Sequence, residues 1–120
     1  DAPHQKLTAE SRLPGDPTKD KLVERMIRVD HAGEYGAVRI YAGQRAVLRH
    51  GAAARAIDEM AEKEREHLAA FDRLVGERRV RPTALMPLWH IAGFALGAVT
   101  AMMGTRAAMA CTVAIEEVIE

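Results

Sequence analysis

Apolar residues recur three and four positions apart along most of the chain, which is the spacing of one face of an α-helix. The first run begins at Asp16–Pro17, an N-cap residue followed by proline at the first helical position, and continues to about His50. Gly51 interrupts the pattern, and a second run extends to about Arg79. Pro82 ends this second helix because proline lacks an amide hydrogen and restricts the residue before it.

The third segment is apolar throughout, with no Asp, Glu, Lys or Arg from residue 83 to residue 105. We expect a third long helix, and three settings are open for it: burial in a bundle or oligomer, docking in a membrane interface, or a membrane span. Gly93 and Gly97 form a GxxxG spacing that favours close helix contact. Three arginines within residues 78–81 either meet anionic head groups or form a solvated helix end. Since no β pattern competes, the sequence predicts an all-α fold with about three helices.

The domain organisation follows from the same pattern. Residues 1–17 mix proline, glycine and charge without a period and predict a flexible tail before one domain, residues 18–120. The chain has 17 basic and 17 acidic residues, so its charge gives no attraction to nucleic acid. The lone Cys111 predicts an inert packed thiol in a reducing compartment. The helical pattern of residues 113–120 has no closing Gly or Pro, and we expect the chain to be cut there.

Carboxylates supply the candidate chemistry. Glu64 and His67 form a Glu-x-x-His pair, and residues three apart share a helix face where they can bind one metal centre. If the first two helices fold back at Gly51, Glu34 and His67 lie at the same level, each about 25 Å from the turn. Glu116 follows an apolar run on the third helix. Oxygen ligands with imidazole suit iron or manganese, and four-helix bundles hold two such metals with this residue pattern.

These residues also have simpler explanations. A Glu-x-x-His spacing arises by chance in a helix as rich in charge as this one, where it is part of a solvated face. A buried Glu34 could instead pair with an arginine or with His31.

Several ordered blocks over residues 20–120 resemble the demethoxyubiquinone hydroxylase family of ubiquinone biosynthesis. They are far more specific together than a Glu-x-x-His pair alone. These blocks are HAGEYGA (31–37), RIYAGQ (39–44), RPTALMPLW (81–89), GFALGA (93–98) and AMACTVAIEE (108–117).

The resemblance implies a ferritin-like bundle whose two iron ions activate O2 and insert one oxygen into the ring of a quinone precursor. Carried over by position, it implies that the metal ligands are Glu34, Glu64, His67 and Glu116. Family members have a second Glu-x-x-His on a further helix, and this sequence ends before it. The resemblance therefore implies that this chain alone lacks a complete catalytic centre.

The resemblance also implies partners and a location. Residues 83–105 would dock at the cytoplasmic face of a bacterial inner membrane and admit the quinone from the lipid. Trp89 and Phe94 would line its path or simply pack in the core, and Tyr35 and Tyr41 would carry electrons, orient ligands or simply pack. The electron donor is open, with NADH as a candidate. We expect a homo-oligomer because an uncovered apolar face favours association with another chain.

Two rival functions belong to other classes. One is a ferritin-like iron-binding protein without quinone chemistry, which would not need the uncharged segment. The other is a non-catalytic helical membrane or interaction module. Metal content separates them, since about two irons per site favours the oxygenase and no binding favours the module.

Overall fold

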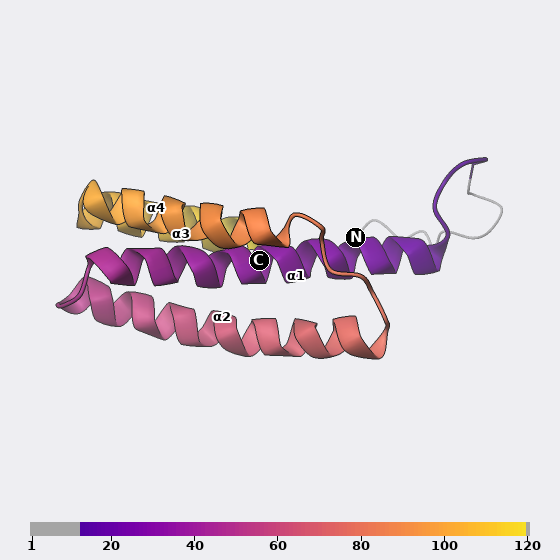
Figure 1. Cartoon of the computed structure of the whole chain (residues 1–120), viewed down its shortest axis with the longest axis horizontal. Helices are drawn as coiled ribbons and strands as arrows, with labels where there is room; N and C mark the ends of the chain where they lie inside the picture. The colour runs from indigo at the N-terminus through magenta and orange to yellow at the C-terminus, as the bar shows by residue number, and fades with distance from the viewer. Residues whose placement is uncertain (1–12, 120) are drawn as a thin grey trace, which may run out of the picture.

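The computed structural model describes residues 13–119, and all the regular structure in this range is helical. Figure 1 shows helix α1 in the middle, with α2 along one side and with α3 and α4 along the other. The bounds are Lys19–Val47 for α1, Ala52–Glu77 for α2, Met86–Met102 for α3 and Thr105–Ile119 for α4. The all-α, ferritin-like class predicted from the sequence is confirmed.

Helices α1 and α2 form an antiparallel hairpin whose ends differ slightly from the prediction. The N-cap of α1 is Thr18, whose side chain accepts from the Lys21 amide at 3.3 Å. The predicted N-cap, Asp16, instead accepts from the Leu13 amide at 2.8 Å and closes a turn before the helix. Gly51, at φ 97°, begins α2 as expected. The predicted tail lies largely outside the described residues, since only residues 13–17 of it are described.

The segment predicted as one third helix is two helices, α3 and α4, so this part of the prediction is wrong. The break falls at Gly104, which has φ 119°, a conformation that side chains with a Cβ rarely adopt. The chain reverses there, and α4 returns along α3 and α1 (Figure 1). Reversal at this point is what returns Glu116 toward the middle of the hairpin.

The GxxxG spacing is used inside the molecule. A Cβ on Gly97 would collide with the carbonyl oxygen of Ile40, and one on Gly43 would collide with that of Phe94. Glycines on both helices therefore let the α1 and α3 backbones touch, which confirms the predicted close contact and identifies α1 as its partner. Arg39 reinforces it, because its Nε donates to the His90 carbonyl at 2.9 Å.

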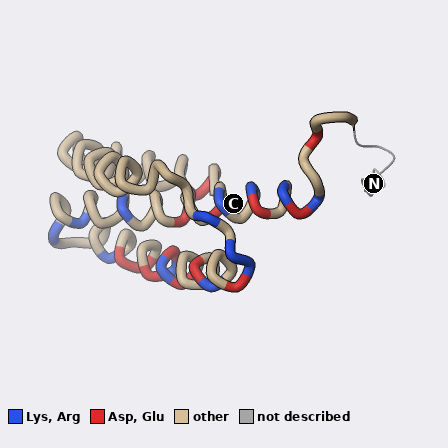
Figure 2. Tube along the Cα trace, turned by 45° about the vertical axis from the view of Figure 1, so that its right-hand side comes forward, with Lys and Arg blue, Asp and Glu red and all other residues tan. Residues whose placement is uncertain are grey.

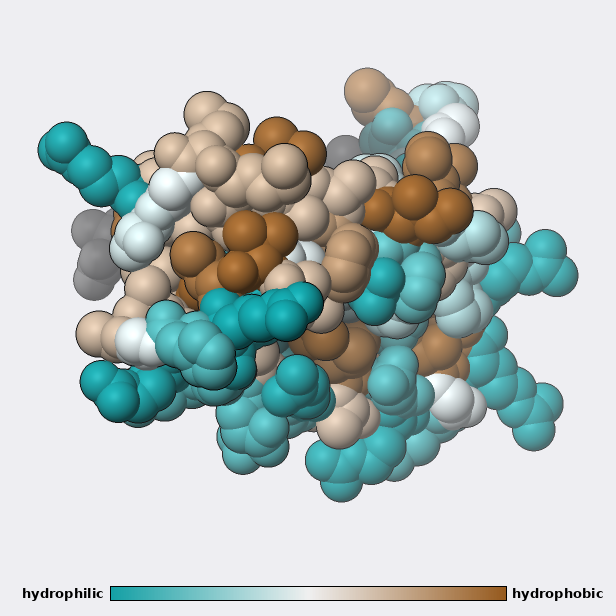
Figure 3. Space-filling model, turned by 60° about the vertical axis from the view of Figure 1, so that its left-hand side comes forward, coloured by the Kyte–Doolittle hydropathy of each residue, from teal (hydrophilic) through white to brown (hydrophobic). Residues whose placement is uncertain are grey.

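The two sides of α1 differ in polarity. Figure 2 shows charged residues along α1 and α2 and almost none on α3, and Figure 3 shows an apolar upper part above a hydrophilic lower part. Large apolar side chains of α3 face outward; Ile91 is 69% exposed and Val99 54%. Within residues 13–119, no helix combines the length and hydropathy needed to cross a membrane.

Candidate metal centre

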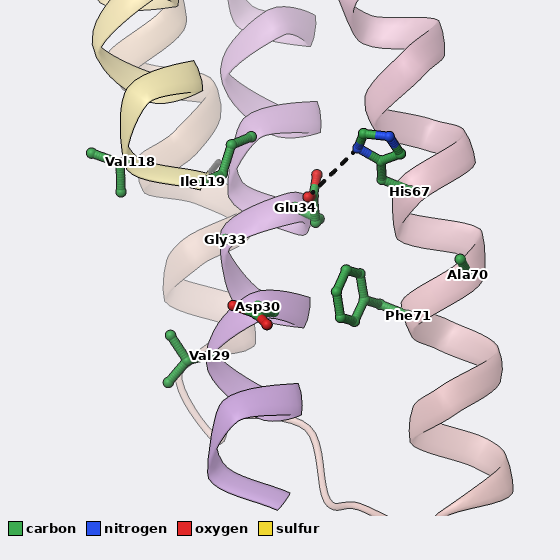
Figure 4. A pocket seen from close by; sticks show the side chains of 9 residues that line it. All are labelled: Val29, Asp30, Gly33, Glu34, His67, Ala70, Phe71, Val118 and Ile119. Atoms are coloured by element: carbon green, nitrogen blue, oxygen red, sulfur yellow. Dashed lines mark ion pairs between the residues drawn. The ribbon is translucent and has the colours of Figure 1, made fainter. Parts of the chain in front are cut away.

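The hairpin brings Glu34 of α1 to Glu64 and His67 of α2. His67 Nδ1 lies 3.7 Å from Glu34 Oε1 and 3.5 Å from Glu64 Oε2. One ligand atom from each of the three residues lies within 4.8 Å of the others, which is compact enough to surround one cation. Figure 4 shows Glu34 and His67 facing each other across the space between the two helices. The predicted meeting of these residues at one level is confirmed; their role as ligands stays a prediction.

Both carboxylates of this cluster are buried, with Glu64 only 1% exposed. Glu34 Oε2 and Glu64 Oε2 are buried and have no hydrogen-bond partner among the described residues. Leaving a buried carboxylate oxygen unpaired is costly, and a bound cation removes that cost. The donor set, two carboxylates and an imidazole, suits Fe(II) or Mn(II), so the residues present fit the metal that the family resemblance implies.

Without a metal, a proton takes the place of the cation. Burial raises the pKa of Glu64 to about 8, helped by a hydrogen bond shared with Glu34 and by the charges of Glu34 and Glu116; His67 opposes the shift. At neutral pH the metal-free carboxyl is therefore mostly protonated. Metal binding must displace this proton, which couples metal affinity to pH.

Glu116 lies beside the cluster rather than within it. It is not among the residues whose ligand atoms gather within 4.8 Å, although its charge is near enough to raise the pKa of Glu64. Its Oε1 accepts a hydrogen bond from the Tyr41 hydroxyl at 2.6 Å. Its neighbour Glu117 is exposed. The structure thus brings together three of the four predicted ligands and leaves the fourth outside the cluster, near enough for its charge to act on Glu64.

The structure bears on the two simpler explanations, a solvated helix face and a pair between Glu34 and His31. The motif glutamate, Glu64, is buried, whereas the flanking Glu62 and Glu66 are exposed, so Glu64 is no part of the solvated face. His31 does not pair with Glu34, because its Nε2 lies 2.7 Å from Asp72 Oδ1 instead. This pair joins α1 to α2 near the cluster and was missed from the sequence; the only signal was a buried-face histidine one turn before Glu34.

One cavity adjoins the cluster, and a second cavity shares part of its wall. The first, about 470 Å³, opens beside Glu34 and His67 (Figure 4). The second, about 290 Å³, lies between α1, α3 and α4 and is almost wholly apolar. The two share Gly33, Val118 and Ile119 in their walls. Trp89 lines the second cavity, and its place on a quinone path stays a prediction. Phe94 is not among the described residues that line this cavity. The Arg39 guanidinium lies over the Phe94 ring instead, with its Cζ 5.1 Å from the ring centre.

Comparison with known proteins gives a family. A model of the family described as "Ubiquinone biosynthesis protein COQ7" matches residues 21–120. A 3-demethoxyubiquinol 3-hydroxylase from Rhodospirillum rubrum is 61% identical over 114 residues, covering 94% of this chain and 54% of that relative. The mitochondrial NADPH-dependent 3-demethoxyubiquinone 3-hydroxylase of Dictyostelium discoideum is 55% identical, covering 91% of this chain and 50% of that relative. The enzyme of the same name from Homo sapiens is 60% identical, covering 79% of this chain and 44% of that relative.

Fold and geometry place the chain in the class of all-α, ferritin-like bundles with a carboxylate–histidine cluster whose carboxylates are buried. The chain belongs to the ubiquinone biosynthesis protein COQ7 family, as the resemblance indicated. It spans about half the length of the relatives it matches.

Proposed function

We propose that this chain contributes to an O2-dependent hydroxylase that acts on the ring of a demethoxyubiquinone-type quinone precursor. The observation that carries the proposal is the Glu34–Glu64–His67 cluster in a member of a family whose relatives are named for this reaction. Its two carboxylates are buried, and each has one oxygen without a hydrogen-bond partner within residues 13–119. Two iron ions are the proposed cofactor, held by Glu34, Glu64, His67 and Glu116. When bound, they supply the activation of O2.

The chain's own residues hold the metal and control water and protons around it. Glu34 and Glu64 balance the charge of a bound cation, and the proton on Glu64 leaves when the cation enters. His67, with a side chain 47% exposed, sits at the edge of the first cavity, where the cluster meets solvent or substrate. Val118, Ile119 and Phe71 line the same cavity and restrict water.

The apolar cavity is the proposed route of the quinone. Its walls, which include Trp89 and Leu96 of α3, suit an apolar ring and tail, and it shares residues with the cavity at the cluster. The exposed apolar side chains of α3 would rest in a membrane surface, at the cytoplasmic face of a bacterial inner membrane, so that the substrate enters from lipid. The arginines at 78, 79 and 81 are exposed and would meet anionic head groups there.

The proposal also includes the source of electrons and the assembly of the chain. The mitochondrial relatives are named as NADPH-dependent, which supports a nicotinamide nucleotide as the electron source, with NADH and NADPH as the two forms to compare. A homo-oligomer is proposed because large apolar side chains on α3 and α4 are exposed, including Met102 and Val118. Two chains would then share ligands across a two-fold axis.

An isotope experiment tests the function and separates it from its rivals. The chain, assembled as the proposed homo-oligomer, loaded with Fe(II) and given a demethoxyubiquinone, a reductant and ¹⁸O2, is expected to form a hydroxylated product carrying one ¹⁸O atom. Glu64→Ala should abolish the product, whereas Glu66→Gln, an exposed position on the same helix, should leave it unchanged. Bound iron without labelled product would instead favour the iron-binding protein, and absence of iron binding would favour the helical module.

A further inference from the structure

A side-chain hydrogen bond joins α1 to α4. Tyr41 is fully buried, and its hydroxyl donates to Glu116 Oε1 at 2.6 Å. Tyr41 lies seven residues after Glu34, two turns along the same face of α1. The phenol of tyrosine has an ordinary pKa of about 10, so the hydroxyl keeps its proton. It therefore remains a donor to Glu116 over the whole physiological pH range.

A second contact holds α4 in the same register. Gln44, also fully buried, donates from Nε2 to the Ala108 carbonyl at 3.0 Å. Its Oε1 accepts from the Thr112 hydroxyl at 3.4 Å, and Thr112 precedes Glu116 by one helical turn. A shift of α4 by one turn, about 5.4 Å, would break both contacts at once. Tyr41 and Gln44 together thus fix where Glu116 lies along α1.

No cationic side chain of the described residues pairs with Glu116. Within residues 13–119, no salt bridge joins α4 to another helix. The Tyr41 hydroxyl engages only Oε1, which leaves Oε2 for another interaction. The carboxylate is half-buried and lies near enough to Glu64 for their charges to interact.

We propose that Tyr41 is a positioning residue that holds the Glu116 carboxylate beside the Glu34–Glu64–His67 cluster and so makes it available as a fourth metal ligand. The inference rests on the proposed metal centre. A carboxylate held by a neutral donor keeps its charge and one free oxygen, whereas a lysine or arginine in place of Tyr41 would offset its charge. Gln44 supports the same placement through the backbone of α4.

Cobalt(II) titration of the full chain tests this inference. Binding is followed by calorimetry and by the visible d–d absorption of the ion, which reports its ligand set. Tyr41→Phe should weaken Co(II) binding by about 10- to 100-fold, the usual effect of removing a group that orients a ligand. The spectrum should change as it does in Glu116→Gln, and the double variant should bind no more weakly than Glu116→Gln alone. The control is Thr100→Val, which removes a hydroxyl that donates to the Gly97 carbonyl within α3 and should have no effect.

A rescue variant separates positioning from folding. Fluorotyrosine at residue 41 keeps the ring and a more acidic hydroxyl, and it should retain the original Co(II) affinity even if Tyr41→Phe folds poorly. Wild-type affinity in a folded Tyr41→Phe chain, or full additivity in the double variant, would overturn the role of Tyr41 while leaving the metal centre in place. Failure of the unsubstituted chain to bind Co(II) would overturn both.

Discussion

Replacing Glu64 with glutamine should change how the stability of the metal-free chain depends on pH. Burial raises the pKa of Glu64 from the ordinary glutamate value of 4.5 to about 8, so between these pH values the folded state binds a proton that the unfolded state lacks. The resulting stabilisation is complete below about pH 4.5 and is lost as the pH rises through 8. Each pH unit in this window changes the free energy of unfolding by at most about 1.4 kcal/mol, which gives an upper limit of about 4 to 5 kcal/mol.

Glu64→Gln should remove this dependence, because an amide cannot ionise and still donates a hydrogen bond to Glu34 as the protonated carboxyl does. Urea unfolding followed by circular dichroism, in a chelator from pH 5 to 8.5, measures the effect. The variant should match the unsubstituted chain near pH 5 and exceed it near pH 8, while the exposed Glu66→Gln should follow the unsubstituted chain. Parallel pH profiles for Glu64→Gln and the unsubstituted chain would refute the shared proton.

Three further outcomes follow from the structure. Gly97→Ala should lower the free energy of unfolding by about 3 kcal/mol or more, because the added methyl meets the α1 backbone. Gly76→Ala, where the added methyl meets nothing within 4 Å, should raise it by about 0.5 to 1 kcal/mol. Thermal melts that show the same change in both variants would contradict the close contact. Cobalt(II) affinity should rise about tenfold per pH unit between pH 6 and 8 as the Glu64 proton is displaced, and a flat calorimetric profile would speak against this exchange. Paired Ile91→Glu and Val99→Glu substitutions should weaken binding to anionic lipid vesicles more than tenfold in a flotation assay; unchanged binding would refute docking through α3.

The hairpin and its cluster could be predicted because both depend on helix geometry alone. Counting residues from Gly51 placed Glu34 and His67 at one level, and the structure separates their atoms by 3.7 Å. The three-residue spacing of Glu64 and His67 put both on one helix face for the same reason. Periodicity and a turn residue are enough to predict which residues meet when two long helices form an antiparallel hairpin.

The break at Gly104 was missed, although this glycine, unlike Gly93 and Gly97, lies at the end of the uncharged segment and is followed by Thr105 and Arg106. Glycine is typical just after a helix and threonine just before one. Gly93 and Gly97 lie inside α3, where their missing Cβ atoms admit α1, whereas Gly104 has a left-handed φ. The difference arises from tertiary contacts and from the return of α4. The contact between Tyr41 and Glu116 depends on that return, which explains why the partners of Glu116 were not visible in the sequence.

Anaerobic Fe(II) titration of the full chain, followed by O2 and Mössbauer spectroscopy, tests the central claim most directly. We expect about two irons per assembled site and a coupled ferric pair after O2, both lost in Glu64→Ala and Glu116→Ala and both kept in Glu66→Gln. A folded chain that binds no iron, or that binds it equally well without Glu64, would contradict the proposed metal centre.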